Sequence, residues 1–124
     1  MLKILLIGSG GFIGAVSRFL FTKYAGGFAD TFPLGTLGVN IIGSFLLGFV
    51  GFSLFLPQYI SDDVRDMITV GFIGGFTTMS SFAFETVKLN DLGHFSLAVM
   101  NLVLNITLCI AAVFAGKALA LSIK

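Results

Sequence analysis

Charge is what this 124-residue sequence has least of, since 10% of its residues are charged while 56% are hydrophobic. Soluble domains carry about 25% charged residues, and a soluble fold of this length would still expose much of its area. The same numbers exclude a disordered chain, because disorder needs low hydrophobicity and high charge. The composition therefore predicts an integral membrane protein.

The sequence also lacks the residues that several other classes of protein need. Its single cysteine, Cys109, cannot build a disulfide framework or a multi-cysteine metal site. Seven Lys and Arg against six Asp and Glu leave a net charge of +1, so no basic face indicates nucleic acid as a partner.

Four apolar segments are long enough to cross a bilayer, which takes roughly 20 helical residues. They are interrupted only by short polar stretches, so we expect residues 1–124 to form a single transmembrane domain. Outer-membrane strands would show alternating segments of about ten residues, whereas these runs are continuous, so we predict an all-α fold. The predicted spans are residues 2–21, 34–56, 64–84 and 95–121.

The first span admits two other interpretations. Lys3 followed by an apolar run resembles a signal peptide, but no clear small-residue cleavage site follows it. Gly8, Gly11 and Gly14 have the spacing of a dinucleotide-binding turn, and Asp30 lies about where a ribose-binding acid would. That turn needs alternating strands and helices, which the rest of the sequence does not predict. We prefer a membrane helix whose glycines, at GxxxG spacing, allow close packing.

Positive charges do not fix the orientation of the four spans. Both termini and the loop at residues 57–63 share one side, which carries Lys3, Arg65, Lys117 and Lys124. The other side carries Arg18, Lys23 and Lys88. Four charges against three is a small bias for the positive-inside rule. Two interpretations stay open: one orientation, or both orientations joined in an antiparallel dimer.

Neutral polar side chains form two stripes within the spans, because residues four apart share a helix face. The second span carries Thr36, Asn40 and Ser44, and the fourth carries Asn101, Asn105 and Cys109. Such groups join helices in membranes or line a path for a solute, and two matched stripes favour the path. The first, second and fourth spans lack the acidic residues that a proton-coupled exporter normally needs. Neutral donors with Arg18 nearby suit a small anion better than a cation.

The third span contains an unusual concentration of glycine and hydroxyl residues. Glycine and adjacent threonines weaken a helix, and a break within the bilayer is tolerated where the freed backbone faces protein or a polar cavity. Broken membrane helices commonly hold Na⁺ with the freed carbonyls. We therefore prefer a break near residues 74–78 over a continuous helix with a glycine groove.

Three segments resemble the signatures of the small bacterial fluoride channels, the Fluc or camphor-resistance protein B family. They are GGFIGAVSRF at 10–19, GTLGVNIIGSF at 35–45 and GFIGGFTTMSSF at 71–82. The resemblance implies a dual-topology, antiparallel homodimer of four-helix subunits with two pores, set in lipid in the bacterial cytoplasmic (inner) membrane. It implies passive fluoride export without a catalytic residue. It also implies a structural Na⁺ at the dimer centre, held by the carbonyls of Gly74 and Thr77.

The resemblance also assigns roles to side chains. Asn40 matches a pore asparagine, while Arg18 and Glu85 match vestibule or supporting positions. Two phenylalanines whose ring edges contact the anion fall on Met79 and Phe82, so this sequence departs from the family at the first of them. The fourth-span polar track maps onto Asn101, Asn105 and Cys109. The other predicted pore residues are Thr36, Ser44, Ser80 and Ser81.

Two functions of other classes remain as alternatives. A proton-coupled exporter of the small multidrug-resistance type also has four spans and dual topology, but the intramembrane glutamate of its first span is lacking here. A non-transporting scaffold is the second alternative. Fluoride efflux from liposomes that contain the purified protein would separate all three.

Overall fold

The computed structural model describes residues 1–26, 31–53 and 56–123, and every regular element within them is a helix. Four helical segments in this part of the chain are long and apolar enough to cross a membrane: Leu2–Ala25, Leu34–Phe52, Asp62–Asp91 and Phe95–Ser122. The predicted all-α class with four spans is therefore confirmed. Asp30, Lys124 and the stretch 54–55 of the predicted second span lie outside the described residues.

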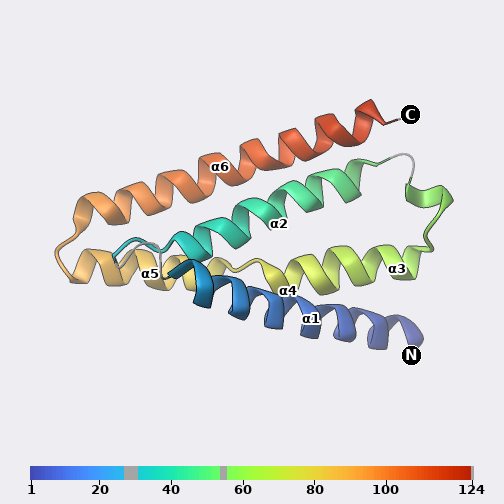
Figure 1. Ribbon diagram of the computed structural model, residues 1–124, viewed down its shortest axis with the longest axis horizontal. Coiled ribbons are helices and arrows are strands. Elements are labelled where there is room, and N and C mark those ends of the chain that lie inside the picture. The colour runs from blue at the N-terminus through green and yellow to red at the C-terminus, as the bar shows by residue number, and fades with distance from the viewer. Residues whose placement is uncertain (27–30, 54–55, 124) are drawn as a thin grey trace.

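Three of the spans are continuous helices; the first and second lie beside the third span, and the fourth lies beside the second and, near its start, beside the last piece of the third (Figure 1). They are α1 (Leu2–Ala25), α2 (Leu34–Phe52) and α6 (Phe95–Ser122). The chain reaches the third span through a short 3₁₀ turn, η2 (Leu56–Gln58). Both termini lie at the end of the molecule where the third span begins (Figure 1), as four crossings require.

The third span is assembled from four helical pieces. It comprises α3 (Asp62–Asp66), the π-helical η3 (Met67–Ile73), α4 (Gly74–Phe76) and α5 (Met79–Asp91). Between the last two, Thr77 (φ −83°, ψ 158°) and Thr78 (φ −151°, ψ 113°) adopt extended backbone. The predicted break is therefore confirmed and falls on the paired threonines. The Thr78 hydroxyl accepts a hydrogen bond from the Ser81 N–H and caps α5.

Glycines set the contact between α1 and the third span. A methyl group added to Gly75 would lie 2.6 Å from the carbonyl oxygen of Gly11, and Gly10 and Gly14 lie equally tight against the backbone of η3. Small residues allow this approach in a membrane. The interpretation of the first span as a close-packing helix is confirmed, and residues 2–25 contain no strand for a dinucleotide-binding turn.

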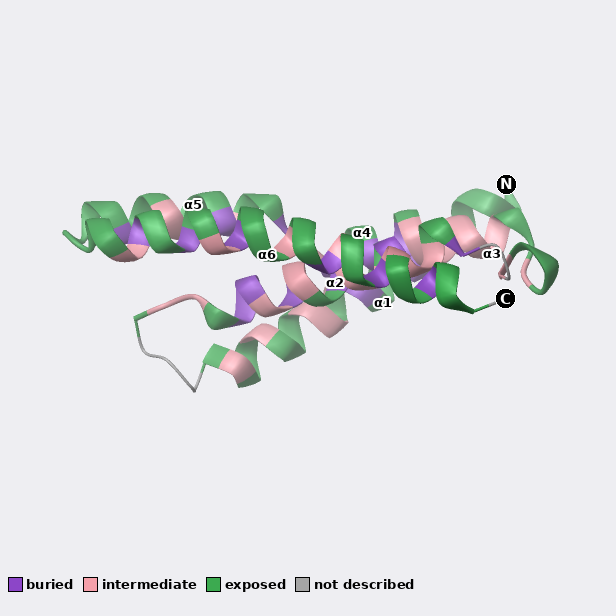
Figure 2. Ribbon diagram, turned by 90° about the horizontal axis from the view of Figure 1, so that it is seen from above, coloured by how far each residue is buried: buried purple, intermediate pink, exposed green. Residues whose placement is uncertain are grey.

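The α2–α6 pair uses the same device nearer the termini. Gly48 lies against the backbone of Val113, and Gly116 against the backbone of Phe45. The buried residues lie mainly where helices face one another, while much of the outward surface of α1 and α6 is exposed and apolar (Figure 2). Such a surface suits lipid or a second protein chain as its neighbour.

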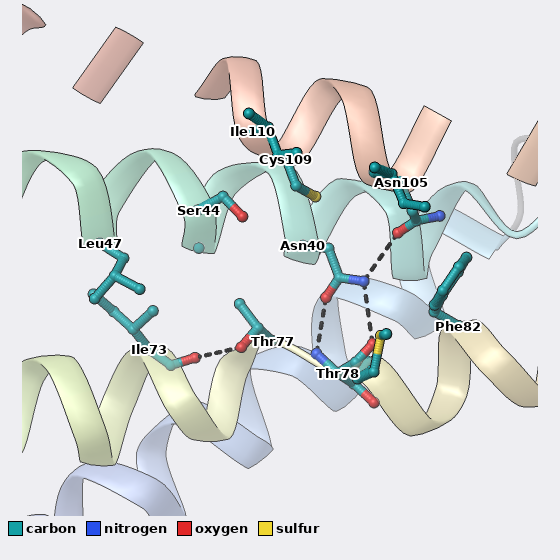
Figure 3. A pocket seen from close by; sticks show the side chains of 13 residues that line it. Asn40, Ser44, Leu47, Ile73, Thr77, Thr78, Phe82, Asn105, Cys109 and Ile110 are labelled. Atoms are coloured by element: carbon teal, nitrogen blue, oxygen red, sulfur yellow. Dashed lines mark hydrogen bonds between the residues drawn. The ribbon is translucent and has the colours of Figure 1, made fainter. Parts of the chain in front are cut away.

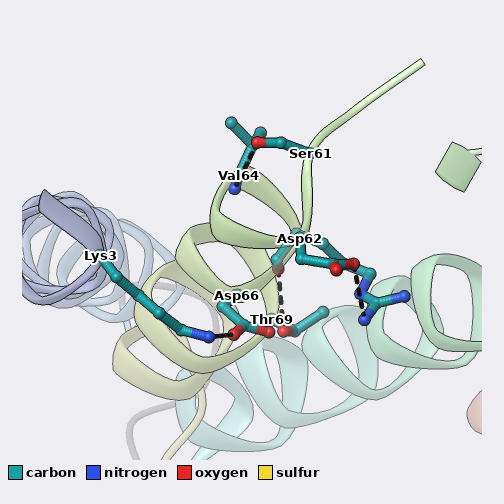
Figure 4. Close-up of polar contacts among 7 residues, drawn as sticks. Lys3, Ser61, Asp62, Val64, Asp66 and Thr69 are labelled. Carbon is teal, nitrogen blue, oxygen red and sulfur yellow. Dashed lines mark hydrogen bonds and ion pairs between the residues drawn. The ribbon is translucent and has the colours of Figure 1, made fainter. Parts of the chain in front are cut away.

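Ion pairs and a cation–π contact lie toward the end that carries the termini. Lys3 of α1 pairs with Asp66 at the end of α3 (Figure 4). Arg65 pairs with Asp62 one turn earlier on α3, at 3.2 Å. On the neighbouring pair of helices, the Lys117 ammonium lies 4.6 Å from the ring centroid of Phe52. Lys3, Arg65 and Lys117, three of the positive charges counted for the orientation of the spans, therefore each contact another group of the protein.

Candidate functional site

A cavity of about 410 Å³ lies between α2, α6 and the break in the third span (Figure 3). Its polar lining comes from the two predicted stripes and from the break itself. Apolar side chains complete the wall, including Phe82 and the exposed Met79. The polar residues that line it are Asn40, Ser44, Thr77, Thr78, Asn105 and, as a thiol, Cys109.

Asn40 of α2 replaces the helical hydrogen bonds that the chain loses at Thr78. The Thr78 N–H donates to Asn40 Oδ1 at 2.8 Å, and Asn40 Nδ2 donates to the Thr78 carbonyl at 3.1 Å. Extended backbone points the N–H and C=O of one residue the same way, so one amide satisfies both. Because an unpaired backbone group is costly in a membrane, Asn40 is needed for the break itself.

Arg18 supports the break from the opposite side. Its Nη1 donates to the Thr77 carbonyl at 3.1 Å. Arg18 lies near the end of the predicted first span, residues 2–21, but α1 continues to Ala25 and the guanidinium lies against the break. The carbonyl freed at Thr77 gives Arg18 a partner within the protein, and the membrane side of Arg18 stays a prediction. Lys23 and Lys88 remain as the positive charges near that end.

The two asparagines of α6 form hydrogen bonds with α2 and α5. Asn40 Nδ2 also donates to Asn105 Oδ1 at 3.0 Å. Asn105 Nδ2 donates to both the main-chain oxygen (3.0 Å) and the side-chain oxygen (2.9 Å) of Asn101. Asn101 Nδ2 donates to the Thr86 hydroxyl at 2.9 Å. The two predicted stripes therefore meet, but Asn101 is fully buried behind Asn105 and does not line the cavity.

Hydroxyl groups gather at the N-terminus of α5. The Thr78 hydroxyl lies 3.0 Å from that of Ser81 and 3.3 Å from that of Ser80. The first turn of a helix presents unpaired N–H groups and a partial positive charge. This end of α5 is therefore suited to an anion.

A second cavity, of about 320 Å³, lies at the end of the molecule opposite the termini. It is lined in part by Thr36, Glu85, Lys88 and His94. The Thr36 hydroxyl donates to Glu85 Oε1 at 2.7 Å, while Oε2 is buried without a partner among the described residues. The predicted site residues are thus divided between two cavities. Thr36, predicted for the pore, and Glu85, predicted for a vestibule or supporting position, line this one, whereas Asn40 and Phe82 line the first.

Comparison with known proteins places the chain in a family. The family model described as CrcB-like protein, Camphor Resistance (CrcB), matches residues 5–117. The chain belongs to the CrcB-like family. The resemblance noted in the sequence is thereby confirmed.

Curated relatives match this CrcB-like chain over nearly its whole length. "Fluoride-specific ion channel FluC 1" of Methanosarcina acetivorans is 42% identical over 126 residues, covering 99% of this chain and 94% of the relative. "Fluoride-specific ion channel FluC" of Shewanella sp. strain W3-18-1 is 41% identical over 123 residues and 98% of each chain. "Fluoride-specific ion channel FluC 3" of Methanosarcina barkeri is 39% identical over 124 residues, covering 100% of this chain and 94% of the relative.

Sequence reasoning missed two side chains that this CrcB-like fold places in the network. Thr78 caps α5, and its backbone N–H and carbonyl both form hydrogen bonds with Asn40. A threonine directly before a helix is a recognisable capping signal. Thr86 accepts from Asn101 and donates to the Phe82 carbonyl at 2.8 Å. No sequence signal marks Thr86, because its partner comes from another helix.

Proposed function

We propose that this protein is a fluoride channel that lets F⁻ cross the cytoplasmic membrane passively. The observation that carries the proposal is the match of almost the whole chain to relatives named as fluoride-specific ion channels, at 41–42% identity. The cavity at the break supports it, because this wall offers neutral donors and a phenyl ring. A channel of this kind needs no catalytic residue.

The chemistry of the lining suits a small, strongly hydrated anion. Hydroxyl and thiol groups and the positive edge of a phenyl ring each offer a weak partner to F⁻. Ser44, Cys109 and Phe82 supply these groups in the lining. The predicted pore residues Ser80 and Ser81 are not among the lining residues, but their hydroxyls lie beside that of Thr78 at the break. Several weak partners in series allow an ion to enter and also to leave.

Passive transport is sufficient for export. Hydrogen fluoride enters from an acidic exterior and dissociates at neutral cytoplasmic pH, which leaves the anion trapped inside. A selective leak then carries F⁻ outward without ATP or protons. A proton-coupled exporter needs a carboxylate in its path, whereas the residues that line the cavity at the break include no Asp or Glu.

The proposed assembly is an antiparallel homodimer with two pores. Met79 lines the cavity and is 75% exposed on the subunit, so a second copy could cover it. Adding two lysines to the loop at residues 57–63 should fix one orientation and remove activity. Coexpression with an oppositely biased variant should restore it. Full activity of the fixed variant alone would contradict the antiparallel arrangement.

The proposed structural Na⁺ would rely on backbone oxygens. No group of three or more His, Cys, Asp or Glu that could bind a metal occurs in the described part of the chain. The Thr78 N–H turns to Asn40, which releases the Gly74 carbonyl from its helical partner. The Thr77 carbonyl accepts from Arg18 and keeps a second lone pair. A bound cation would balance these carbonyl dipoles at the break.

Liposome efflux tests the proposed function. Liposomes loaded with potassium fluoride and containing the purified protein receive valinomycin, and a fluoride electrode records release. We expect fast release of F⁻ and little release from chloride-loaded liposomes recorded with a chloride electrode. Release no faster than from protein-free liposomes, with protein that elutes as one folded species, would refute the proposal.

A further inference from the structure

A continuous chain of hydrogen bonds joins two backbone groups of the third span by way of α2 and α6. It starts at the Thr78 N–H and passes through the side chains of Asn40 and Asn105. It continues through Asn101 and Thr86 and ends at the Phe82 carbonyl. The five links measure 2.8, 3.0, 2.9, 2.9 and 2.8 Å.

The two ends of the chain fix its direction. A backbone N–H can only donate and a carbonyl can only accept, so the Asn40 oxygen must face Thr78 and the Thr86 hydroxyl must donate to Phe82. Each amide between them then has one allowed orientation. Turning over any of the three would place a donor against a donor or an acceptor against an acceptor.

The same bonds leave the α6 asparagines with little to offer an ion. Both N–H groups of Asn105 point at oxygens of Asn101, and Asn105 is 5% exposed. Asn101 is 0% exposed. The two N–H groups of Asn40 are also engaged, by Thr78 and Asn105. Sequence reasoning treated these three residues as anion ligands in the pore wall.

We propose instead that Asn101, Asn105 and Thr86 are positioning residues. They hold the Asn40 amide in the one orientation that supports the break, and they anchor it to the backbone at Phe82. The ion then meets the hydroxyls and the ring that this network holds in place. This inference rests on the proposed fluoride channel function and assigns its residues a different role.

Thr86 offers the sharpest test, because it lines neither cavity. Thr86→Val removes the hydroxyl and keeps the shape, while Thr86→Ser keeps the hydroxyl. We expect Thr86→Val to slow fluoride efflux at least about fivefold, as one lost hydrogen bond would. Thr86→Ser should stay within about twofold of the wild type. Thr107→Val, on an exposed part of α6, is the matched control.

A double-mutant cycle separates positioning from direct contact with the ion. If Asn105 acts through Asn40, the double variant Asn40→Ala/Asn105→Leu should conduct no worse than the slower single variant. If each residue contacts the ion by itself, the two losses should multiply. Multiplying losses would overturn the inference, even if every variant purifies as a folded protein.

Hydrogen exchange at the Thr78 amide gives a readout that does not depend on transport. Thr86→Val should speed this exchange, because it breaks the network of hydrogen bonds that holds Asn40 against the Thr78 N–H. Thr86→Ser keeps the hydroxyl and should not. Suppose that the wild type passes fluoride and that Thr86→Val changes neither the efflux rate nor the exchange rate of the Thr78 amide. That result would overturn this inference and leave the proposed channel function standing. A wild-type protein that passes no fluoride would overturn both proposals.

Discussion

The third span contacts its neighbours in two different ways on its two sides. Toward α1 the contact is steric apart from the Arg18–Thr77 hydrogen bond and the Lys3–Asp66 ion pair, since Gly75 and Gly11 bring two backbones together with no room for a methyl group. Toward α2 and α6 it is directional, since amides and hydroxyls satisfy the backbone that the break exposes. The comparison teaches that a broken membrane helix needs both a face without side-chain bulk and a face with matched donors and acceptors.

The steric face should be the more sensitive to added volume. Gly75→Ala places a methyl group 2.6 Å from the Gly11 carbonyl oxygen, and that backbone cannot yield as a flexible side chain would. We expect a loss of about 1–3 kcal/mol or more in stability and a much lower yield of folded protein by size-exclusion chromatography. Gly8→Ala is the control, because nothing lies within 4 Å of the added atom. Equal melting temperatures for the two variants would contradict this account of the seam.

The directional face should be sensitive to a change of donor or of charge. Asn40→Asp keeps an oxygen for the Thr78 N–H and loses the donors to the Thr78 carbonyl and Asn105. A carboxylate about 4 Å from F⁻ at an effective dielectric near 20 costs roughly 4 kcal/mol. We expect nearly complete loss of fluoride efflux from a protein that still elutes as the wild-type oligomer. Efflux at the wild-type rate would place the ion path elsewhere.

The aromatic wall should divide unequally between Phe82 and Met79. Phe82 is 7% exposed and its carbonyl accepts the last hydrogen bond of the network, whereas Met79, which also lines the cavity, is exposed. Phe82→Ile removes the ring edge and should slow efflux at least about tenfold, close to the upper range of one aromatic contact. Met79→Phe should conduct at least as well as the wild type. If Phe82→Ile conducts normally while Met79→Ala is inactive, the two roles are reversed.

The two threonines of the break give the smallest contrast. The Thr77 hydroxyl donates to the Ile73 carbonyl one turn back, so Thr77→Val should change efflux by less than about twofold. The Thr78 hydroxyl caps α5, so Thr78→Val should cost about 1 kcal/mol in stability. Thermal unfolding and efflux of both variants check this order. A larger loss of stability or of fluoride efflux in Thr77→Val than in Thr78→Val would contradict this order.

Much of the fold could be predicted because lipid makes composition and helix structure nearly equivalent. A chain with 10% charge and four long apolar runs has few ways to satisfy its backbone in a bilayer other than as helices. The break was predictable from local helix propensity, since Gly74 and Gly75 followed by Thr77 and Thr78 weaken a helix. The Thr78 hydroxyl then caps the helix that begins after the break. The motifs also sufficed to indicate the family, which the matching family model confirms.

The residue contacts of the candidate site depended on the tertiary structure. Spacing placed Asn101 and Asn105 on one face of α6, but only packing showed that their donors face other protein groups. Position in the first span could not reveal that Arg18 reaches the Thr77 carbonyl. The sequence by itself determined the class, the number of spans and the break, because these follow from local hydropathy and helix propensity, and its motifs indicated the family. The ends of the spans came from the structure, in which the third span runs on to Asp91 rather than ending at residue 84. Hydrogen-bond partners were decided by the tertiary structure, because a donor's acceptor is set by which helix packs beside it and at what height.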